Sequence, residues 1–301
     1  TAPDGNVGLY AGKSVLLSER PDGRGLSAQV TLPEGTVDNH GRIVADAGTV
    51  ALHARVVNQG GTIQANTVRN VGGVIELVAS ESVNLQAGSA ISAQGVESGA
   101  RGGEVRLKSD GAFTDTAGSS INVSGSSTGG DGGRVALSAP QMSEIASRIE
   151  ARAAAGSRGG ELVVDPQDIV ISNSGSGSAG SGTVNSGDAP AAGTLTFRPS
   201  AFASFSQITL QATHDITVAT PWNLANTADP TSTLRLQAGN DINLYNAITA
   251  GNNWSVELVA GANFTVPSAA NPASAVNAGV GSVNFFSSGA VQTQNGHLGL
   301  Y

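Results

Sequence analysis

The sequence contains no cysteine, which excludes a disulfide framework, a thiolate metal site and a cysteine nucleophile. It has only four histidines, and no two of them stand at a spacing typical of metal ligands. Lysine and arginine number 15 against 23 acidic residues, a balance that argues against binding to nucleic acid. No run of 18 apolar residues is present, so no membrane-spanning helix is expected.

Aromatic residues make up 4% of the chain and charged residues 13%, whereas glycine accounts for 41 of 301 residues, about twice the usual share. The apolar content comes mainly from valine, isoleucine, leucine and alanine, and the polar content from serine, threonine, asparagine and glutamine. This composition is typical of many short strands joined by tight turns.

A phrase that opens with two glycines recurs along the first half of the chain. It begins at Gly72, Gly102, Gly132 and Gly159, in steps of 30, 30 and 27 residues. The second and fourth positions after the last glycine are apolar each time, a period of two that predicts strands with one buried face. These inward pairs are Ile75/Leu77, Val105/Leu107, Val135/Leu137 and Leu162/Val164.

Related phrases with one glycine or none occur elsewhere and predict equivalent strands. Six residues after the last inward position comes another apolar residue, which predicts a second strand, and several units carry a third. The related pairs are Val7/Leu9, Val50/Leu52, Leu195/Phe197, Ile208/Leu210, Leu234/Leu236, Val256/Leu258 and Val283/Phe285. The second-strand positions are Val15, Val83, Phe113, Val170, Ile216, Ile242, Phe264 and Val291.

One such unit cannot bury its apolar face alone, but units stacked on one another can. The sequence therefore predicts an all-β fold, a right-handed parallel β-helix (a solenoid) with coils of about 22–33 residues and loop excursions. A β-sandwich or a β-propeller is the alternative, although the propeller signatures at 40–45-residue spacing are missing.

We expect three segments along this solenoid. Residues 1–172 form a β-helix of Gly-Gly repeats, residues 173–193 form a low-complexity Gly/Ser loop, and residues 194–301 continue the coils. Residues 140–156 break the phrase, and their apolar spacing fits either a helix or two strands within one coil. We favour the strands because the unit length is preserved.

The polar motifs are better explained by turns than by catalytic or metal-binding sites. Asp165 and Asp168 could be paired carboxylates, but an Asp-Pro bend whose aspartate binds backbone N–H groups explains them better. The stretches 129–134 and 239–243 are similar to calcium loops, yet neither carries the tandem nonapeptide that such loops need. No serine-histidine-aspartate set is recognisable, and Gly-His-Leu near the end lacks the acidic partners of a polygalacturonase. We therefore predict no catalytic residue, no metal and no cofactor.

Binding to sugars is the remaining possibility. Trp222, Trp254 and Tyr245 are candidate platforms for pyranose rings, although covering coil edges is the more ordinary role for them. A glycosidase on this fold would need acidic and basic side chains together on one exposed sheet. No motif ties together the acidic residues of the early coils, which are Glu76, Glu104, Asp110 and Asp115.

The stretches APDGNVGLYAGKSVLL, GTIQANTVRNVGGVIELVASESVNLQAGSAISAQG and GGELVVDPQDIVIS resemble filamentous haemagglutinin-type exoproteins of bacterial two-partner secretion. The resemblance covers most of residues 1–172 and, more loosely, the ITLQATHDITV and LRLQAGNDINL repeats. It implies a secreted β-helix that an outer-membrane transporter barrel exports. Members of this family are adhesins, biofilm-matrix proteins or stalks that present a toxin.

Three functions follow as hypotheses. The first is a non-catalytic rod segment of a secreted, cell-surface adhesin that attaches to surface glycans or matrix polysaccharide. The second is a polysaccharide-degrading enzyme on the same fold, and the third is the stalk of a toxin-delivery protein. Because exposed coil ends are open sheet edges, we also expect the chain either to be capped by more protein in the intact molecule or to associate end to end.

Overall fold

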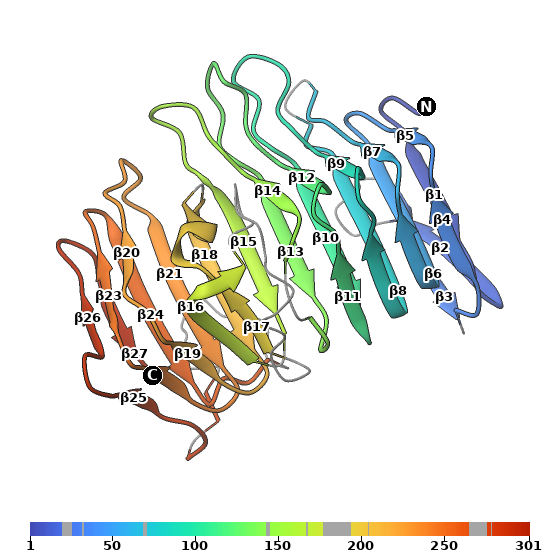
Figure 1. Cartoon of the computed structure of the whole chain (residues 1–301). Helices are drawn as coiled ribbons and strands as arrows, with labels where there is room; N and C mark the ends of the chain where they lie inside the picture. Colours follow the sequence, from blue (N-terminus) through green and yellow to red (C-terminus); the bar gives the residue numbers. More distant parts are fainter. Residues whose placement is uncertain are drawn as a thin grey trace. The chain divides into compact units, whose positions relative to one another are not determined.

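The computed structural model describes two compact units, each built almost entirely of β-strands (Figure 1). Unit 1 comprises residues 1–140 and 146–161, and unit 2 comprises residues 141–145 and 162–301. Within the described ranges, no helix is long and apolar enough to cross a membrane. Those ranges are 1–19, 26–31, 33–68, 71–142, 145–166, 168–176, 194–203, 205–264, 276–277 and 279–301.

The first sheet of unit 1 is formed by the predicted inward pairs. Its strands run parallel, and each pairs with the strand about one repeat further along the chain. The register matches the phrase, since Val50 lies opposite Ile75, and Ile75 lies opposite Val105. In order the strands are β1 (Asn6–Tyr10), β6 (Thr49–Gln59), β8 (Val74–Leu85), β10 (Glu104–Ser109) and β13 (Arg134–Ser138), with β4 (Thr36–Asn39) beside β6 and β11 (Ala112–Asp115) beside β8.

The second sheet of unit 1 contains the predicted third strands. Its five strands are short and parallel, and each centres on an isoleucine. They are β5 (Arg42–Val44), β7 (Thr62–Gln64), β9 (Ala90–Ser92), β12 (Ser120–Asn122) and β14 (Arg148–Glu150). Ile63, Ile91, Ile121 and Ile149 form a column with almost no exposed surface.

The described part of unit 2 has three parallel sheets and one short 3-10 helix, η1 (Pro199–Phe202). The first sheet consists of β15 (Gly160–Asp165), of which residues 160–161 belong to unit 1, β18 (Phe205–Ala212), β21 (Ser232–Ala238), β24 (Trp254–Ala260) and β27 (Leu298–Leu300). The second consists of β17 (Thr194–Phe197), β16 (Asp168–Ser176), β19 (Ile216–Val218), β22 (Ile242–Leu244) and β25 (Val283–Phe285). The third consists of β20 (Trp222–Leu224), β23 (Ala247–Ala250) and β26 (Ala290–Gln292).

The core of each unit consists of the inward aliphatic columns. The predicted inward residues of β6, β8, β10, β13, β18, β21 and β24 have an exposed fraction of 1% or less. Strands that alternate in this way, one repeat apart and in register, bury one face continuously. Long parallel sheets of this kind are compatible with a parallel β-helix.

The glycine pairs are explained by the close approach of neighbouring repeats. A Cβ atom on Gly103 would lie 2.3 Å from the carbonyl oxygen of Gly73, and one on Gly133 would lie 2.1 Å from that of Gly103. A Cβ on Gly102 would lie 1.9 Å from the carbonyl oxygen of Val123. Glycine is therefore required by the backbone of the adjacent repeat at Gly103 and Gly133, and by the backbone of its own repeat at Gly102.

Several sequence predictions about strands are wrong. Phe264, expected to begin a second strand, lies in a turn and is 37% exposed, and Val291 belongs to the third sheet of unit 2. Leu195/Phe197 and Val283/Phe285 were expected among the first strands, yet β17 and β25 belong to the second sheet of unit 2. Val170 was expected to point inward, but its neighbours Ile169 and Ile171 are buried instead. The Asp-Pro bend after Val164 shifts the alternation by one residue, and a shift of one exchanges the two faces of a strand.

The segment after β1 also departs from the repeat. Val15 lies in β2 (Ser14–Glu19), which pairs antiparallel with β3 (Leu26–Thr31) in a separate two-stranded sheet. Val15 is therefore partly exposed, and it does not begin a buried second strand.

Residues 140–156 contain one of the two favoured strands, and no helix among those described. Residues 148–150 form β14, whereas residues 145–147, expected in the other strand, form none. Residues 143–144 lie outside the described residues. The predicted loop 173–193 begins differently, because β16 continues to Ser176, and residues 177–193 lie outside the described residues.

Candidate functional site

Charged side chains gather on the outward face of the first sheet of unit 1. Arg106 on β10 lies 3.3 Å from the carboxylate of Glu76 on β8 and 2.7 Å from that of Glu104. Arg134 on β13 lies 3.6 Å from Glu104 and 2.7 Å from Glu161. Three acidic and two basic residues thus alternate across successive repeats and neutralise one another.

This charged ladder corrects the expectation that the early coils have no acidic and basic group on one sheet. The sequence reasoning named Glu76 and Glu104 but missed Arg106 and Arg134. The repeat itself carries the signal, because Glu104, Arg134 and Glu161 each follow directly after a glycine pair. Residues at one phrase position share one column of a parallel sheet, so they must be neighbours.

The other acidic residues of the early repeats are also engaged. The carboxylate of Asp115 accepts hydrogen bonds from the backbone N–H groups of Ala146 and Ser147, at 2.9 and 2.7 Å. Burial raises the pKa of Asp115, and these hydrogen bonds oppose that effect. Asp110 lies 3.7 Å from Lys108 on the surface. These geometries favour structural roles for both carboxylates.

A second polar array, in unit 2, connects the bends that precede the second sheet. Asp168 accepts a hydrogen bond from the N–H of Asp215, Asp215 accepts one from Asp241, and Asp241 accepts one from Ser282. The donor-acceptor distances are 3.0, 3.0 and 2.8 Å. Each aspartate therefore holds the start of the next strand. Asp168 and the stretch 239–243 therefore serve to hold neighbouring strands in place. The side chain of Asp165 lies outside the described residues.

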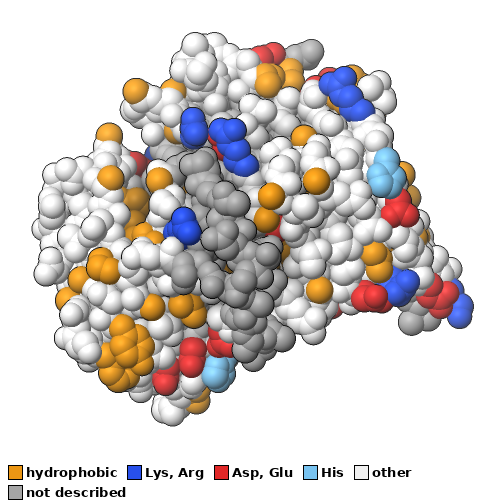
Figure 2. All heavy atoms as spheres, in the orientation of Figure 1, with side chains coloured by type: hydrophobic (Ala, Val, Ile, Leu, Met, Phe, Trp, Pro, Cys, Tyr) orange, Lys and Arg blue, Asp and Glu red, His pale blue; other side chains and the backbone are white. Residues whose placement is uncertain are grey.

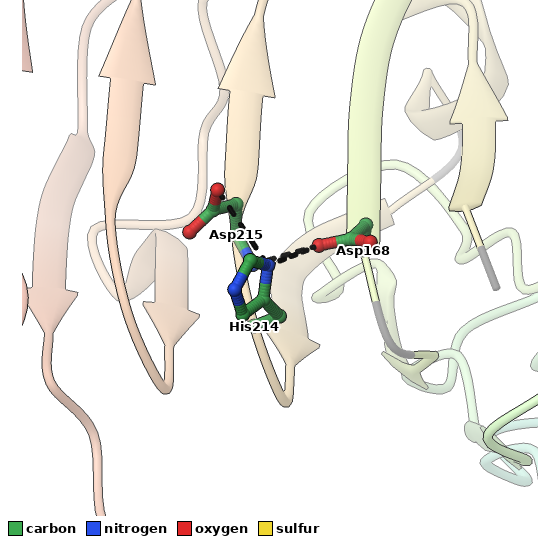
Figure 3. A group of neighbouring side chains, drawn as sticks. All are labelled: Asp168, His214 and Asp215. Carbon is green, nitrogen blue, oxygen red and sulfur yellow. Dashed lines mark hydrogen bonds and ion pairs between the residues drawn. The ribbon is translucent and has the colours of Figure 1, made fainter. Parts of the chain in front are cut away.

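His214 joins this aspartate ladder at one point (Figure 3). Its Nδ1 atom lies 3.0 Å from Oδ1 of Asp168 and 3.6 Å from Oδ2 of Asp215. The three ligand atoms lie within 4.8 Å of one another, and one imidazole with two carboxylates is a donor set that suits a divalent transition metal. The carboxylates already bind backbone N–H groups, which accounts for their positions without a metal.

We predict that the pKa of His214 lies above the ordinary value of 6.5. The hydrogen bond to Asp168 raises it most, and the negative charge of Asp215 adds to the effect. Because the folded-state pKa is raised, the small stabilisation from this contact is complete below pH 6.5 and is lost as the pH rises through the folded-state pKa. Since the side chain is 56% exposed, the contribution is about 1 kcal/mol or less.

An NMR titration of the His214 ring measures this directly. Asp168→Asn should lower the pKa of His214 towards its ordinary value, whereas the distant Asp4→Asn should leave it unchanged. An identical titration of the wild type and Asp168→Asn would contradict the contact.

Two of the three candidate sugar platforms are buried. Trp222 is fully buried, and Trp254 is 4% exposed with its Nε1 donating to the carbonyl oxygen of Ala225 at 2.8 Å. Neither ring offers a face to a ligand. Tyr245 is 45% exposed and stacks on Phe286 with ring centroids 4.7 Å apart. It is the one predicted platform with an accessible ring.

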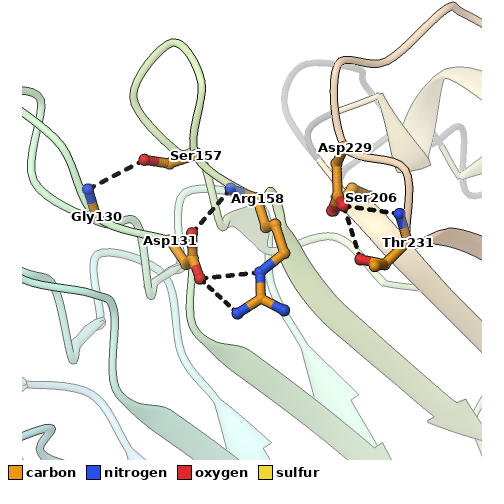
Figure 4. Close-up of polar contacts among 7 residues, drawn as sticks. All are labelled: Gly130, Asp131, Ser157, Arg158, Ser206, Asp229 and Thr231. Atoms are coloured by element: carbon orange, nitrogen blue, oxygen red, sulfur yellow. Dashed lines mark hydrogen bonds and ion pairs between the residues drawn. The ribbon is translucent and has the colours of Figure 1, made fainter. Parts of the chain in front are cut away.

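The glycine-rich stretch 129–134 is a turn, as the sequence favours (Figure 4). Gly129 and Gly130 have φ values of 121° and 114°, which only glycine adopts readily. The carboxylate of Asp131 binds both the backbone N–H and the guanidinium of Arg158. Burial acts to raise the pKa of Asp131, but these contacts outweigh it and lower the pKa. The aspartate thus holds two turns together.

Figure 4 also shows a buried aspartate in unit 2 that plays a similar role. Asp229 accepts hydrogen bonds from the Ser206 hydroxyl and from both the N–H and the hydroxyl of Thr231, at 3.2, 2.9 and 2.7 Å. Its carboxylate therefore binds the bend before β21 through Thr231 and binds β18 through the Ser206 hydroxyl.

Figure 2 shows that charged side chains are sparse on the face in view, where most of the surface is neutral. In comparisons with known proteins, no family model matches the chain, and no curated protein matches it in sequence.

Proposed function

We propose that this chain is a right-handed parallel β-helix that serves as a non-catalytic rod segment of a secreted bacterial adhesin. The observation that carries the proposal is the use of polar side chains to join one repeat to the next. Asn58 donates to Asp38, Asn84 donates to Asn58, and Thr114 donates to Asn84, at 2.6, 2.8 and 2.6 Å. Outward groups that are bound to the next repeat stiffen a rod.

The resemblance to filamentous haemagglutinin-type exoproteins supports the cellular part of the proposal. A protein of that kind is exported through an outer-membrane two-partner secretion barrel and acts at the cell surface or in the biofilm matrix. Export in an unfolded state suits this chain, since it has no cysteine and few charges. The partners proposed are therefore that transporter barrel and surface or matrix polysaccharide.

A polysaccharide-degrading enzyme is the second candidate, because Glu76, Glu104 and Arg106 share one outward face. A glycosidase needs one carboxylic acid that can give up a proton beside a second carboxylate. Here the guanidinium of Arg106 forms ion pairs with both carboxylates, at 3.3 Å from Glu76 and 2.7 Å from Glu104. The rod proposal fits this pairing better.

One experiment separates the two candidates. The purified chain is incubated with a panel of bacterial and host polysaccharides, and both retention and new reducing or unsaturated ends are measured. Retention without cleavage is the expected result for an adhesive segment. Cleavage that is lost in Glu104→Gln and kept in Glu97→Gln, a glutamate outside the ladder, would overturn the proposal in favour of the enzyme.

A further inference from the structure

Three aspartates occupy one column at the start of the second sheet of unit 2. Asp168 begins β16, and the register of β16, β19 and β22 places Asp215 and Asp241 at the same position, one and two strands further along the sheet. Side chains at one position of neighbouring parallel strands are close together, and like charges there repel one another. The column therefore concentrates negative charge that a cation could balance.

Few basic side chains are present in this part of the chain to balance the charge. Residues 162–301 contain two basic residues, Arg198 and Arg235, and Arg235 pairs with Glu257 on the first sheet. The acidic residues of the same range are Asp165, Asp168, Asp188, Asp215, Asp229, Asp241 and Glu257. Among the described residues, His214 supplies the nitrogen ligand that lies beside the column.

The imidazole of His214 lies between two of these carboxylates (Figure 3). The ligands of a tetrahedral zinc ion lie about 2.0–2.2 Å from the metal, which places any two of them about 3.3–3.6 Å apart. In the structure, Nδ1 of His214 lies 3.0 Å from Oδ1 of Asp168 and 3.6 Å from Oδ2 of Asp215. A rotation of the carboxylates closes the remaining separation between their own oxygens, which is at most 4.8 Å. The three atoms are therefore spaced closely enough to share one metal ion.

The hydrogen bonds that position the two carboxylates also leave oxygens for a metal. Oδ1 of Asp215 accepts the side-chain amide of Asn240 and the N–H of Asp241, at 2.9 and 3.0 Å, whereas Oδ2 is the atom nearer to the imidazole. Oδ1 of Asp168 accepts the N–H of Asp215 at 3.0 Å, and a carboxylate oxygen has a second lone pair. Hydrogen bonds of this kind orient the carboxylate ligands of metal sites.

We propose that His214, Asp168 and Asp215 bind one divalent transition metal ion such as Zn²⁺, through Nδ1 of the histidine and one oxygen of each aspartate, with water in the fourth position. The metal takes the place of the hydrogen between Nδ1 and Asp168. One imidazole with two carboxylates suits such a metal, whereas Ca²⁺ and Mg²⁺ prefer about six to eight oxygen ligands. The ion joins β16 to β19 across 46 residues of chain, which stabilises their stacking. This inference does not depend on the proposed function.

Equilibrium dialysis of the metal-stripped chain against Zn²⁺ tests the proposal. The wild type should bind one Zn²⁺ per chain, and an excess of Ca²⁺ or Mg²⁺ should not displace it. Asp168→Asn, Asp215→Asn and His214→Ala should each weaken binding at least about tenfold. Because asparagine keeps an Oδ1 acceptor, the two asparagine variants should retain the backbone hydrogen bonds and fold as the wild type does. His40→Ala, which removes an exposed histidine of unit 1, is the matched control and should bind Zn²⁺ as the wild type does.

Two further readouts locate the ion on the full chain. Zn²⁺ should shift the NMR signals of the His214 ring and leave those of His40 in place, and it should raise the midpoint of thermal unfolding of the wild type but not of His214→Ala. Zn²⁺ binding by the wild type that is no tighter than binding by His214→Ala, or that Asp168→Asn leaves unchanged, would overturn the proposal. Equal competition by Ca²⁺ would overturn it as well, because the histidine would then have no part in binding.

Discussion

Gly103→Ala is expected to destabilise unit 1 by about 3 kcal/mol or more, a large effect for the addition of one methyl group. The new Cβ would lie 2.3 Å from the carbonyl oxygen of Gly73 and 3.1 Å from the Cβ of Ala93. That carbonyl accepts the N–H of Glu104 at 2.9 Å, so it cannot withdraw without breaking the ladder between β8 and β10. Denaturant unfolding followed by circular dichroism measures the loss.

Gly41→Ala is the matched control. The nearest atom to its Cβ is Oδ1 of Asn39 at 3.9 Å, which is ordinary van der Waals contact. The expected change in the free energy of unfolding is within about 1 kcal/mol, and its sign is favourable if the loss of unfolded-state entropy dominates. Equal effects from the two substitutions would mean that neighbouring repeats do not approach as closely as the structure has them.

Trp222→Ala is expected to destabilise unit 2 by about 3–5 kcal/mol. The indole is fully buried, and its ring centroid lies 5.1 Å from that of Phe202, which in turn lies 5.1 Å from that of Phe197. Removing the ring leaves a cavity beside the buried Phe202 ring of η1. The fluorescence of Trp254, the other tryptophan of the chain, reports the unfolding of unit 2 in this variant.

Tyr245→Ala provides the comparison for Trp222→Ala. Tyr245 is 45% exposed, so the loss of its stacking on Phe286 should cost about 1 kcal/mol or less. If glycans are retained by the wild type, Tyr245→Ala is the variant that should weaken retention without unfolding the chain. A stable Trp222→Ala protein that no longer retains glycans would contradict the structural role of Trp222.

The inward columns were predictable from sequence, for a specific physical reason. Val105 and Leu107 follow a glycine pair at fixed positions, and alternation places both on one face of a strand. Since the phrase recurs every 27–30 residues with the same alternation, only one register buries every pair. The observed pairing of Val105 with Ile75 and Val135 confirms that register.

The assignment of strands to sheets was less predictable. The phrase around Leu195 and Phe197 is the same apolar alternation as in the first sheets, yet β17 joins the second sheet. Alternation tells which face of a strand is buried but not which sheet the strand enters. The bends decide which sheet a strand enters. The bend at Asp165-Pro166 also changed which of the following residues point inward.

The candidate sites also differ in how far the sequence could predict them. The column of Glu104, Arg134 and Glu161 could be read from the period, because each follows a glycine pair. The contact between His214 and Asp168 could not be predicted from the period. These two residues are 46 positions apart, whereas two other contacts of the aspartate ladder join residues 26 and 41 positions apart. Insertions of unequal length remove the fixed offset on which such a prediction depends.

Pairwise cysteine trapping across the ladders tests the stacking of repeats most directly, one pair in each unit. Residues opposite one another on neighbouring parallel strands are about 4.8 Å apart, within the range a disulfide spans, whereas a shift of two residues gives about 8 Å. The register partners are Glu76 with Arg106 and Arg235 with Glu257. The shifted pairs are Glu76 with Lys108 and Thr233 with Glu257.

With cysteines at these positions, the register partners should form intramolecular disulfides rapidly and nearly completely, and the shifted pairs should not. Cross-linking of the shifted pairs, or none in the register partners, would contradict the stacked parallel repeats on which the proposed rod depends.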